Sequence, residues 1–471
     1  MKTDGSVDLH QRFENQRAAF AREPFPSWSV RRDRLRRLQA LLLANEEALA
    51  GAIDADFGGR PVAETELLEM YPALEEVKSA LRHGARWMRP RRSPVAKWYV
   101  PARGRIVPQP LGVVGIIASW NYPIFLSVGP LAGALAAGNR AMLKLSEFTP
   151  AFDELFARLI AGAFAQDELT VINGDATVAA DFSALPFDHL LFTGSTAVGR
   201  KVMMAASANL TPVTLELGGK SPAVIAPDYP LEHAVARILT GKLLNAGQTC
   251  IAPDYVLVPR SKTDAFVAAA RVRANKMFPA KLSSVDYCSV VNARQYARLT
   301  GYLAQALEQG ARIEALFEGP QRDDARHRLA PSLVIDPPAR LDLMQDEIFG
   351  PVLPVLPYDS LDEAVQFITA RPRPLALYWF DHQRERIERV MHATHAGGVT
   401  VNDVLLHIVQ DSMPFGGVGP SGMGQYHGKW GFETFSKLKP VFEQSRLNVL
   451  ELFGPPYRPL AKRITQLMKR F

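Results

Sequence analysis

One thiol and one carboxylate in the middle of the chain could act together in acyl chemistry. Glu216 lies in an apolar run, residues 213–217, and two glycines follow this run directly. Cys250 follows a segment whose apolar residues recur at helical spacing, so we expect its thiol in the turn after a helix. A thiolate attacks carbonyl carbon, and a nearby carboxylate can activate the water that later cleaves a thioester. The pair suggests a nucleophile and its base, although a lone cysteine is more often a small buried hydrophobe.

The composition predicts a soluble globular protein of two or three domains. The chain has 471 residues, of which 47% are hydrophobic, enough for several cores. Its two cysteines, Cys250 and Cys288, cannot form a disulfide framework, and the N-terminus shows no apolar signal segment, so we expect a cytoplasmic protein. The formal charge of +6 is spread along the chain among acidic residues, which argues against a nucleic-acid partner.

Two segments raise the question of a membrane. Residues 106–139 carry no charge, but four prolines among them would break a spanning helix. Near the C-terminus, Ile464, Leu467, Met468 and Phe471 recur at helical spacing among basic residues. Such a tail could touch an anionic membrane, but we expect it to pack on its own protein or to fray.

Elements that could position the thiol and the carboxylate alternate along the chain. Apolar runs at 113–118, 141–145, 169–172, 189–193 and 213–217 predict strands, with helical patterns between them. This alternation predicts a doubly wound parallel sheet, whose ligands bind at the carboxyl ends of the strands. A second α/β unit follows, to about residue 401. Residues 35–50 and 63–83 predict helices, 86–105 an extended arm with a possible strand at 98–100, and 321–328 a surface loop.

Three short motifs follow predicted strands of the first sheet. In SWNYP, residues 119–123, the amide of Asn121 could donate a hydrogen bond to an oxyanion, although asparagine in a turn is more often structural. In KLSE, Lys144 and Glu147 could hold ribose hydroxyls, or could form an ordinary surface ion pair. FTGSTAVG, residues 192–199, offers a glycine turn and a helix start to a phosphate, but it is not the GxGxxG fingerprint.

Seven motifs in order resemble the aldehyde dehydrogenase superfamily: SWNYP, KLSE, FTGSTAVG, LELGGKSP, NAGQTC, EIFGPVLPV and PFGGVGPSGMG. The resemblance covers residues 106 to about 441. The segment from Asn402 and the motif QYHGKWGFETFS at 425–436 look most like the class 3 branch, which includes bacterial coniferyl aldehyde dehydrogenases.

The resemblance implies a mechanism through sulfur. Cys250 would be the nucleophile, Glu216 the base for the deacylating water, and Asn121 with the backbone N–H of Cys250 the oxyanion hole. An aldehyde would form a thiohemiacetal, lose a hydride to the nicotinamide, and leave as a carboxylic acid. The expected contacts to the cofactor are Trp120, Lys144, Glu147, Gly194, Ser195, Glu347 and Phe349, and we expect no metal site.

The resemblance also implies a fold and an assembly. It predicts a cofactor domain (1–85 and 106–217) and a catalytic domain (218–403). It also predicts a bridging element (86–105 and 404–441) that pairs subunits into a homodimer, and a C-terminal tail (442–471). Leu145 stands where the family usually has proline. Glu147 should repel a 2′-phosphate and favour NAD, while NADP stays an alternative.

Several alternatives stay open at this stage. A CoA-acylating aldehyde dehydrogenase would not need Glu216 as a base for water. A cysteine hydrolase would need a histidine such as His392, His395 or His407 beside the thiol. A purely structural or binding protein would not need both Cys250 and Glu216. The resemblance favours coniferyl aldehyde, with ferulate as the product, and medium- or long-chain aliphatic aldehydes are the alternative substrates.

Overall fold

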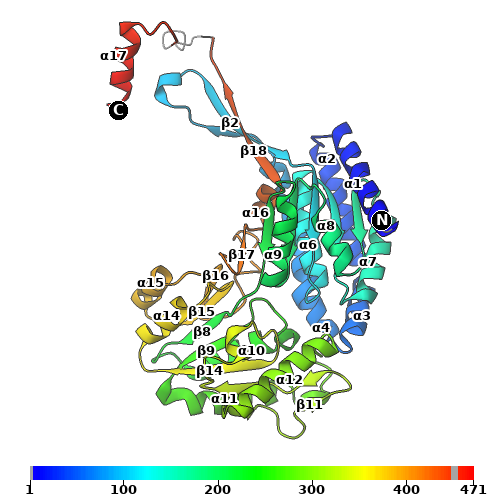
Figure 1. Cartoon of the computed structure of the whole chain (residues 1–471), viewed down its shortest axis with the longest axis vertical. Coiled ribbons are helices and arrows are strands. Elements are labelled where there is room, and N and C mark those ends of the chain that lie inside the picture. Colours follow the sequence, from blue (N-terminus) through cyan, green and yellow to red (C-terminus); the bar gives the residue numbers. More distant parts are fainter. Residues whose placement is uncertain (1–3, 447–453, 471) are drawn as a thin grey trace.

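A computed structural model describes residues 4–446 and 454–470 and contains two large sheets (Figure 1). The first sheet has the strand order β17-β7-β6-β3-β4-β5. All its neighbours pair in parallel except β17, which runs antiparallel to β7. The doubly wound parallel sheet predicted from the alternating pattern is confirmed. Its strands are β3 (Val113–Ile117), β4 (Arg140–Lys144), β5 (Leu169–Ile172), β6 (His189–Thr193), β7 (Val213–Glu216) and β17 (Gly422–Met423).

Helices cover this sheet on both faces, and strands β3 to β6 are therefore buried along their whole length. The crossover helices are α6 (Pro123–Ala137), α7 (Pro150–Ala163), α8 (Ala176–Ser183) and α9 (Thr196–Ser207). Helix α6 is buried along its whole length, and Pro130 lies inside it without ending it. No helix in residues 4–446 and 454–470 is long and apolar enough to cross a membrane.

The N-terminal segment is helical, as predicted, but its helices are divided differently. The expected helix over 35–50 is two helices, because Asn45 has non-helical dihedral angles and its side chain donates to Leu41 O at 2.8 Å. The expected helix over 63–83 contains a π-helical turn, η1, at Glu66–Met70. The helices are α1 (Asp4–Arg22), α2 (Trp28–Ala44), α3 (Glu46–Phe57), α4 (Val62–Thr65) and α5 (Tyr71–Trp87).

The second sheet has the order β10-β13-β14-β9-β8-β15-β16, with only β10 antiparallel to its neighbour. Its strands are β8 (Pro222–Ile225), β9 (Tyr255–Pro259), β10 (Arg312–Ala315), β13 (Ser332–Ile335), β14 (Val352–Tyr358), β15 (Ala376–Phe380) and β16 (Gly398–Val401). Its helices are α10 (Leu231–Leu243), α11 (Thr263–Met277), α12 (Ala293–Glu308), α13 (Asp342–Gln345), α14 (Leu361–Thr369) and α15 (Arg384–Ala393). Residues 321–328, expected to form a loop, include β11 (Arg322–Asp323), which pairs with β12 (Arg328–Leu329).

A three-stranded sheet, β1-β2-β18, leads away from the two large sheets (Figure 1). It contains β1 (Arg91–Ser93), β2 (Arg103–Pro110) and β18 (Ser436–Glu443), so it joins the arm to a segment far along the chain. The strand expected at 98–100 is wrong: Lys97–Tyr99 forms the short 3-10 helix η2, because Tyr99 N–H donates to Ala96 O at 2.8 Å.

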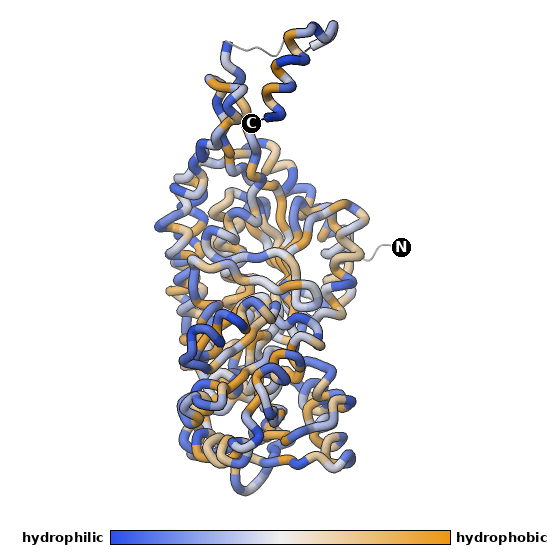
Figure 2. The backbone as a smooth tube through the Cα atoms, turned by 90° about the vertical axis from the view of Figure 1, so that its left-hand side faces the viewer, coloured by the Kyte–Doolittle hydropathy of each residue, from blue (hydrophilic) through white to orange (hydrophobic). Residues whose placement is uncertain are grey.

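Helix α17 (Pro459–Met468) lies at the far end of this arm, and α16 (Gly428–Thr434) packs against α6. Figure 2 shows apolar and polar segments alternating along α17, as the sequence pattern predicts, and it shows apolar strands in the interior of the body. Leu460 and Leu467 of α17 are about half exposed.

Candidate active site

The carboxyl ends of the first sheet open on a cleft of about 840 Å³ that is also lined by helix α12 and by loop residues of the second α/β unit. Strand register explains part of this convergence, because Thr193 of β6 lies opposite Glu216 of β7 at the same edge. Eight of the ten residues expected at the site line the cleft: Trp120, Asn121, Gly194, Ser195, Glu216, Cys250, Glu347 and Phe349. Lys144 and Glu147 are not among the lining residues.

A strained turn carries Cys250. Helix α10 ends in the short segment η3 (Leu244–Gly247), where Asn245 and Ala246 have φ values of 51° and 49°. Gly247 follows with φ 78°, and a Cβ there would overlap the Gly350 carbonyl oxygen. Only glycine fits this position without displacing the backbone of residue 350. The turn that the sequence predicted between a helix and Cys250 is confirmed. The glycine of NAGQTC is Gly247, and the close approach of the Gly350 carbonyl explains why no larger residue fits there.

Gln248 holds the turn in place, a role that the sequence did not reveal. Its side-chain NH₂ donates to Ser289 O at 3.0 Å, and its side-chain oxygen accepts from Val291 N at 2.9 Å. Its own carbonyl accepts from the side-chain amide of Asn121 at 3.1 Å. The segment before Cys250 is therefore bonded on both sides, which fixes where the thiol lies.

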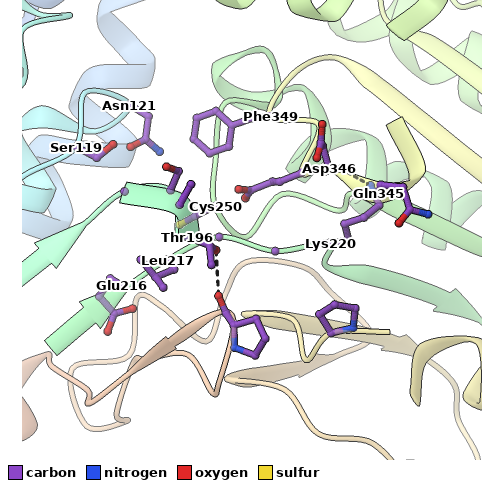
Figure 3. Close-up of a pocket in the computed structure, with 18 of the residues that line it drawn as sticks. Ser119, Asn121, Thr196, Glu216, Leu217, Lys220, Cys250, Gln345, Asp346 and Phe349 are labelled. Carbon is purple, nitrogen blue, oxygen red and sulfur yellow. Dashed lines mark hydrogen bonds between the residues drawn. The ribbon is translucent and has the colours of Figure 1, made fainter. Parts of the chain in front are cut away.

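Asn121 is held by residues far away in sequence. Its carbonyl oxygen accepts from Arg60 Nη1 at 3.0 Å and from Asn245 Nδ2 at 3.1 Å. In Figure 3, Asn121 and Glu216 lie on either side of Cys250, and Phe349 lies across the cleft. A side-chain amide at this position can donate a hydrogen bond to the negatively charged oxygen that forms when the thiol attacks a carbonyl group.

Glu216 carries a buried carboxyl group that has no partner among the described residues. Its backbone is held, since Gly194 N–H donates to Glu216 O at 3.0 Å. Neither side-chain oxygen makes a hydrogen bond, and the residue is only 3% exposed. Burial raises the pKa of this carboxyl well above its usual value. An unpaired buried carboxyl in a cleft is a candidate base with room for a water molecule beside it.

The thiol of Cys250 is also shifted toward its neutral form. Burial is the main cause of its raised pKa, and the negative charges of Glu347 and Glu216 add to it. Burial also raises the pKa of Glu347, to about 8. No histidine is among the residues that line the cleft. Within residues 4–446 and 454–470, no group of His, Cys, Asp and Glu side chains is arranged to hold a metal ion.

The cleft continues past Cys250 toward features that suit a dinucleotide. Ser195 caps α9 by accepting from Val198 N at 3.4 Å, so the free N–H groups of this helix point toward the cleft end. Phe349 packs edge-on against Trp120, with ring centroids 5.4 Å apart. A Cβ at Gly218 would overlap the Glu347 carboxylate, so glycine lets that carboxylate approach the backbone.

Lys144 is the last residue of β4 and Glu147 lies in the turn after it, one strand away from β3, whose following loop lines the cleft. Lys144 is buried, and its ammonium donates to Leu145 O at 2.5 Å and to Gly174 O at 2.7 Å. Glu147 is exposed. The two residues are therefore positioned at the sheet edge, where the sequence predicted them, with Lys144 held by backbone oxygens.

The Arg60 side chain that donates to the Asn121 carbonyl also forms a buried ion pair with Glu69. Their side chains are fully buried with Nη1 and Oε1 2.9 Å apart, and Glu69 Oε2 accepts from Ile124 N at 2.7 Å. We expect Arg60→Met to destabilise the protein by about 3–5 kcal/mol, because it leaves the Glu69 carboxylate buried without a cation to pair with. Urea unfolding followed by tryptophan fluorescence measures the loss. The exposed pair Arg260–Asp359 supplies the control, since Arg260→Ala should leave the midpoint unchanged. Equal midpoints for both variants would contradict this account.

Residues 4–441 match the model of the aldehyde dehydrogenase family. The chain belongs to this family. The sequence resemblance is thereby confirmed, and the protein is an oxidoreductase that acts on aldehydes. The family is NAD(P)-dependent, and the cleft with its free helix N-terminus and its two carboxyl groups fits such a cofactor.

Two curated relatives and one solved structure cover almost the whole chain. "Probable coniferyl aldehyde dehydrogenase" of Pseudomonas aeruginosa is 49% identical over 464 residues, covering 98% of this chain and 96% of that protein. "Coniferyl aldehyde dehydrogenase" of a Pseudomonas species is 44% identical, covering 94% and 92%. The structure titled "Substrate bound state of Staphylococcus Aureus AldH" aligns with a TM-score of 0.92 at 36% identity, covering 98% and 99%.

Proposed function

We propose that this aldehyde dehydrogenase oxidises coniferyl aldehyde to ferulate, with NAD as the preferred cofactor. The observation that carries the reaction type is one cleft that holds the Cys250 thiol, the unpartnered Glu216 carboxyl and the Asn121 amide. The names of the two Pseudomonas relatives support the substrate. Medium- and long-chain aliphatic aldehydes are the second candidate class.

The chain's own residues account for the acyl chemistry. The Cys250 thiol gives its proton to solvent and the thiolate attacks the aldehyde carbon. The Asn121 side chain with the Cys250 backbone N–H stabilises the resulting oxyanion. When bound, NAD(P) would supply the acceptor for the hydride that leaves the thiohemiacetal carbon, and Ser195, Glu347 and Phe349 are the cleft residues that would hold it. Glu216 then takes a proton from water, which attacks the thioester and releases the carboxylic acid with the thiol.

Two experiments separate this proposal from its alternatives. The first compares NAD reduction by the purified protein on coniferyl aldehyde and on hexanal. Faster turnover on coniferyl aldehyde supports the substrate, and a preference for hexanal moves it to the aliphatic class. The second analyses products with and without CoA. An acyl-CoA product would show a CoA-acylating enzyme, whereas free ferulate supports water activation by Glu216.

We propose that Glu147 makes the protein prefer NAD over NADP. We propose that Lys144 and Glu147 hold the adenosine ribose, so that the Glu147 carboxylate repels a 2′-phosphate. Glu147→Gln should then lower the NAD over NADP preference about tenfold, mainly through the KM for NADP. The exposed Glu154, on α7, is a matched control, because Glu154→Gln should leave the ratio unchanged. An unaltered ratio in Glu147→Gln would remove Glu147 from this role.

The assembly and the domain ranges are proposals of the same kind. We propose a cytoplasmic homodimer joined through 86–105 and 404–441, with a cofactor domain of 1–85 and 106–217 and a catalytic domain of 218–403. Strand β18 supports the dimer, because it is an edge strand of the three-stranded sheet β1-β2-β18. Its outer backbone N–H and C=O groups could pair with a strand of a second subunit. Light scattering at micromolar concentration should give the mass of a dimer. Contact of the tail helix α17 with an anionic membrane is an alternative role for its basic face.

A further inference from the structure

Residues 346–351 link helix α13 to strand β14 and form a loop that carries Glu347 and Phe349. Phe349 has φ 51°, a left-handed backbone conformation that phenylalanine rarely adopts. Such a conformation persists only where surrounding contacts impose it. Figure 3 shows Phe349 across the cleft from Glu216. The contacts that hold this loop therefore decide how it faces the groups of the acyl chemistry.

Lys220 ties the 346–351 loop to the strand that carries the base. It lies four residues after Glu216 and lines the cleft. Its ammonium group donates to Leu343 O and to Asp346 O, each at 2.8 Å, and to the carboxylate of Asp254. An ammonium group has three N–H donors, so each of them has an acceptor here. The start of the loop is thereby fixed relative to Glu216.

Asp254 ties the same loop to the segment of the nucleophile. It lies four residues after Cys250 and is 3% exposed. Its Oδ2 pairs with the Lys220 ammonium, and its Oδ1 accepts from Ile348 N at 3.0 Å. Because Ile348 lies directly before Phe349, this bond fixes the strained residue relative to Cys250.

Arg298, on helix α12, holds the loop from a third element. Its Nη1 donates to Glu347 O at 3.2 Å, and its Nη2 donates to Ile348 O at 2.8 Å. Its Nη1 also donates to the Tyr302 hydroxyl at 3.0 Å, and this hydroxyl donates to Asp346 Oδ2 at 3.0 Å. Three consecutive residues of the loop therefore have polar groups bonded to side chains of α12.

We propose that Lys220, Asp254 and Arg298 are positioning residues, which set where the 346–351 loop meets the nicotinamide riboside of NAD(P). This inference rests on the proposed function, in which the loop holds that end of the cofactor beside Cys250. Lys220 and Asp254 belong to the segments of the base and the nucleophile, so they keep the loop in register with the reacting groups. A displacement of about 1 Å between reacting groups can lower a rate roughly 100-fold.

Arg298→Met is the main test, because Arg298 is only partly buried and its partners in the loop are uncharged carbonyl groups. We expect the Kd for NADH, measured by fluorescence titration, to rise roughly tenfold. The rate of NADH formation in the first turnover should fall roughly 10- to 100-fold. Iodoacetamide labelling of Cys250 in the free protein should stay within about threefold, since Gln248 still holds its turn.

Arg37, on helix α2, supplies the matched control. It also donates to a backbone carbonyl, Ala163 O, at 2.8 Å, and it lies outside the cleft. Arg37→Met removes a comparable contact and should leave the Kd for NADH and the first-turnover rate unchanged. A rise in Kd that is equal in both arginine variants would overturn this inference, because it would show a general loss of stability.

A coupling experiment separates positioning from a structural role in another way. In a protein that already carries Glu347→Gln and Phe349→Leu, the loop has lost the side chains that Arg298 would position. Adding Arg298→Met to that protein should lower the first-turnover rate by no more than about twofold. Equal fold losses in this background and in the wild-type protein would contradict action through the loop.

The remaining outcomes are distinguishable. An unchanged Kd for NADH and an unchanged first-turnover rate in Arg298→Met would overturn this inference and leave the proposed function intact. A wild-type protein that binds no NADH, or that oxidises neither coniferyl aldehyde nor hexanal, would overturn the proposed function itself. If Arg298→Met does not fold, Lys220→Met decides by the same measurements.

Discussion

Replacing Cys250 by alanine is expected to abolish aldehyde oxidation, with a fall in kcat of roughly 10⁴-fold or more, because no other nucleophile can form the covalent intermediate. NAD(P)H absorbance in the steady state measures the loss. Cys288 provides the matched control: it is 1% exposed and outside the cleft, so Cys288→Ala should keep kcat within about threefold. Turnover that survives in Cys250→Ala would overturn the assignment of the nucleophile.

Alkylation of the free protein tests the environment of the same thiol without turnover. Because burial, Glu347 and Glu216 raise the pKa of Cys250, the thiolate fraction is small at neutral pH and grows as pH rises. The rate of iodoacetamide labelling should therefore increase through the neutral and alkaline range and vanish in Cys250→Ala. A labelling rate that is independent of pH from 6 to 9, a range of about three units, would show a thiol already ionised.

Replacing Glu216 by glutamine is expected to stall the enzyme after the first half of the reaction. Glutamine cannot take a proton from water, so thioester hydrolysis should slow by roughly 10²- to 10⁴-fold while acylation of Cys250 continues. Rapid mixing with NAD and aldehyde should show a burst of about one equivalent of NADH per active site, followed by slow turnover. A variant with no burst would mean that Glu216 acts before the thioester forms, and undiminished steady-state turnover would exclude it as the base.

The pH profile gives a second measure of Glu216. A base acts only when ionised, and burial raises the pKa of this carboxyl, so the active fraction falls as pH drops below that raised value. The deacylation rate should therefore rise with pH over a range in which an ordinary glutamate is already fully ionised. In Glu216→Gln this dependence should disappear from the slow phase.

Local patterns predicted much of the fold. The five parallel strands of the first sheet and helical segments between them could be predicted from apolar periodicity, which indicates which face of an element is buried. The errors came where a few residues decide the structure. Asn45 ends α2 through a side-chain bond to Leu41, and the arm at Lys97–Tyr99 turns instead of pairing. Such contacts leave little trace in a hydrophobic pattern.

The sequence by itself determined which chemical groups react: a thiol in a glycine-containing turn and a carboxyl at the end of a strand. It also contained motifs typical of aldehyde dehydrogenases. Only the tertiary structure decided what surrounds them. Arg60 and Gln248 hold Asn121 and the turn of Cys250, yet no spacing in the sequence predicts these contacts. The physical reason is that burial and charge act through space. Hydrogen-bond partners and pKa shifts therefore depend on which distant segments the fold brings together.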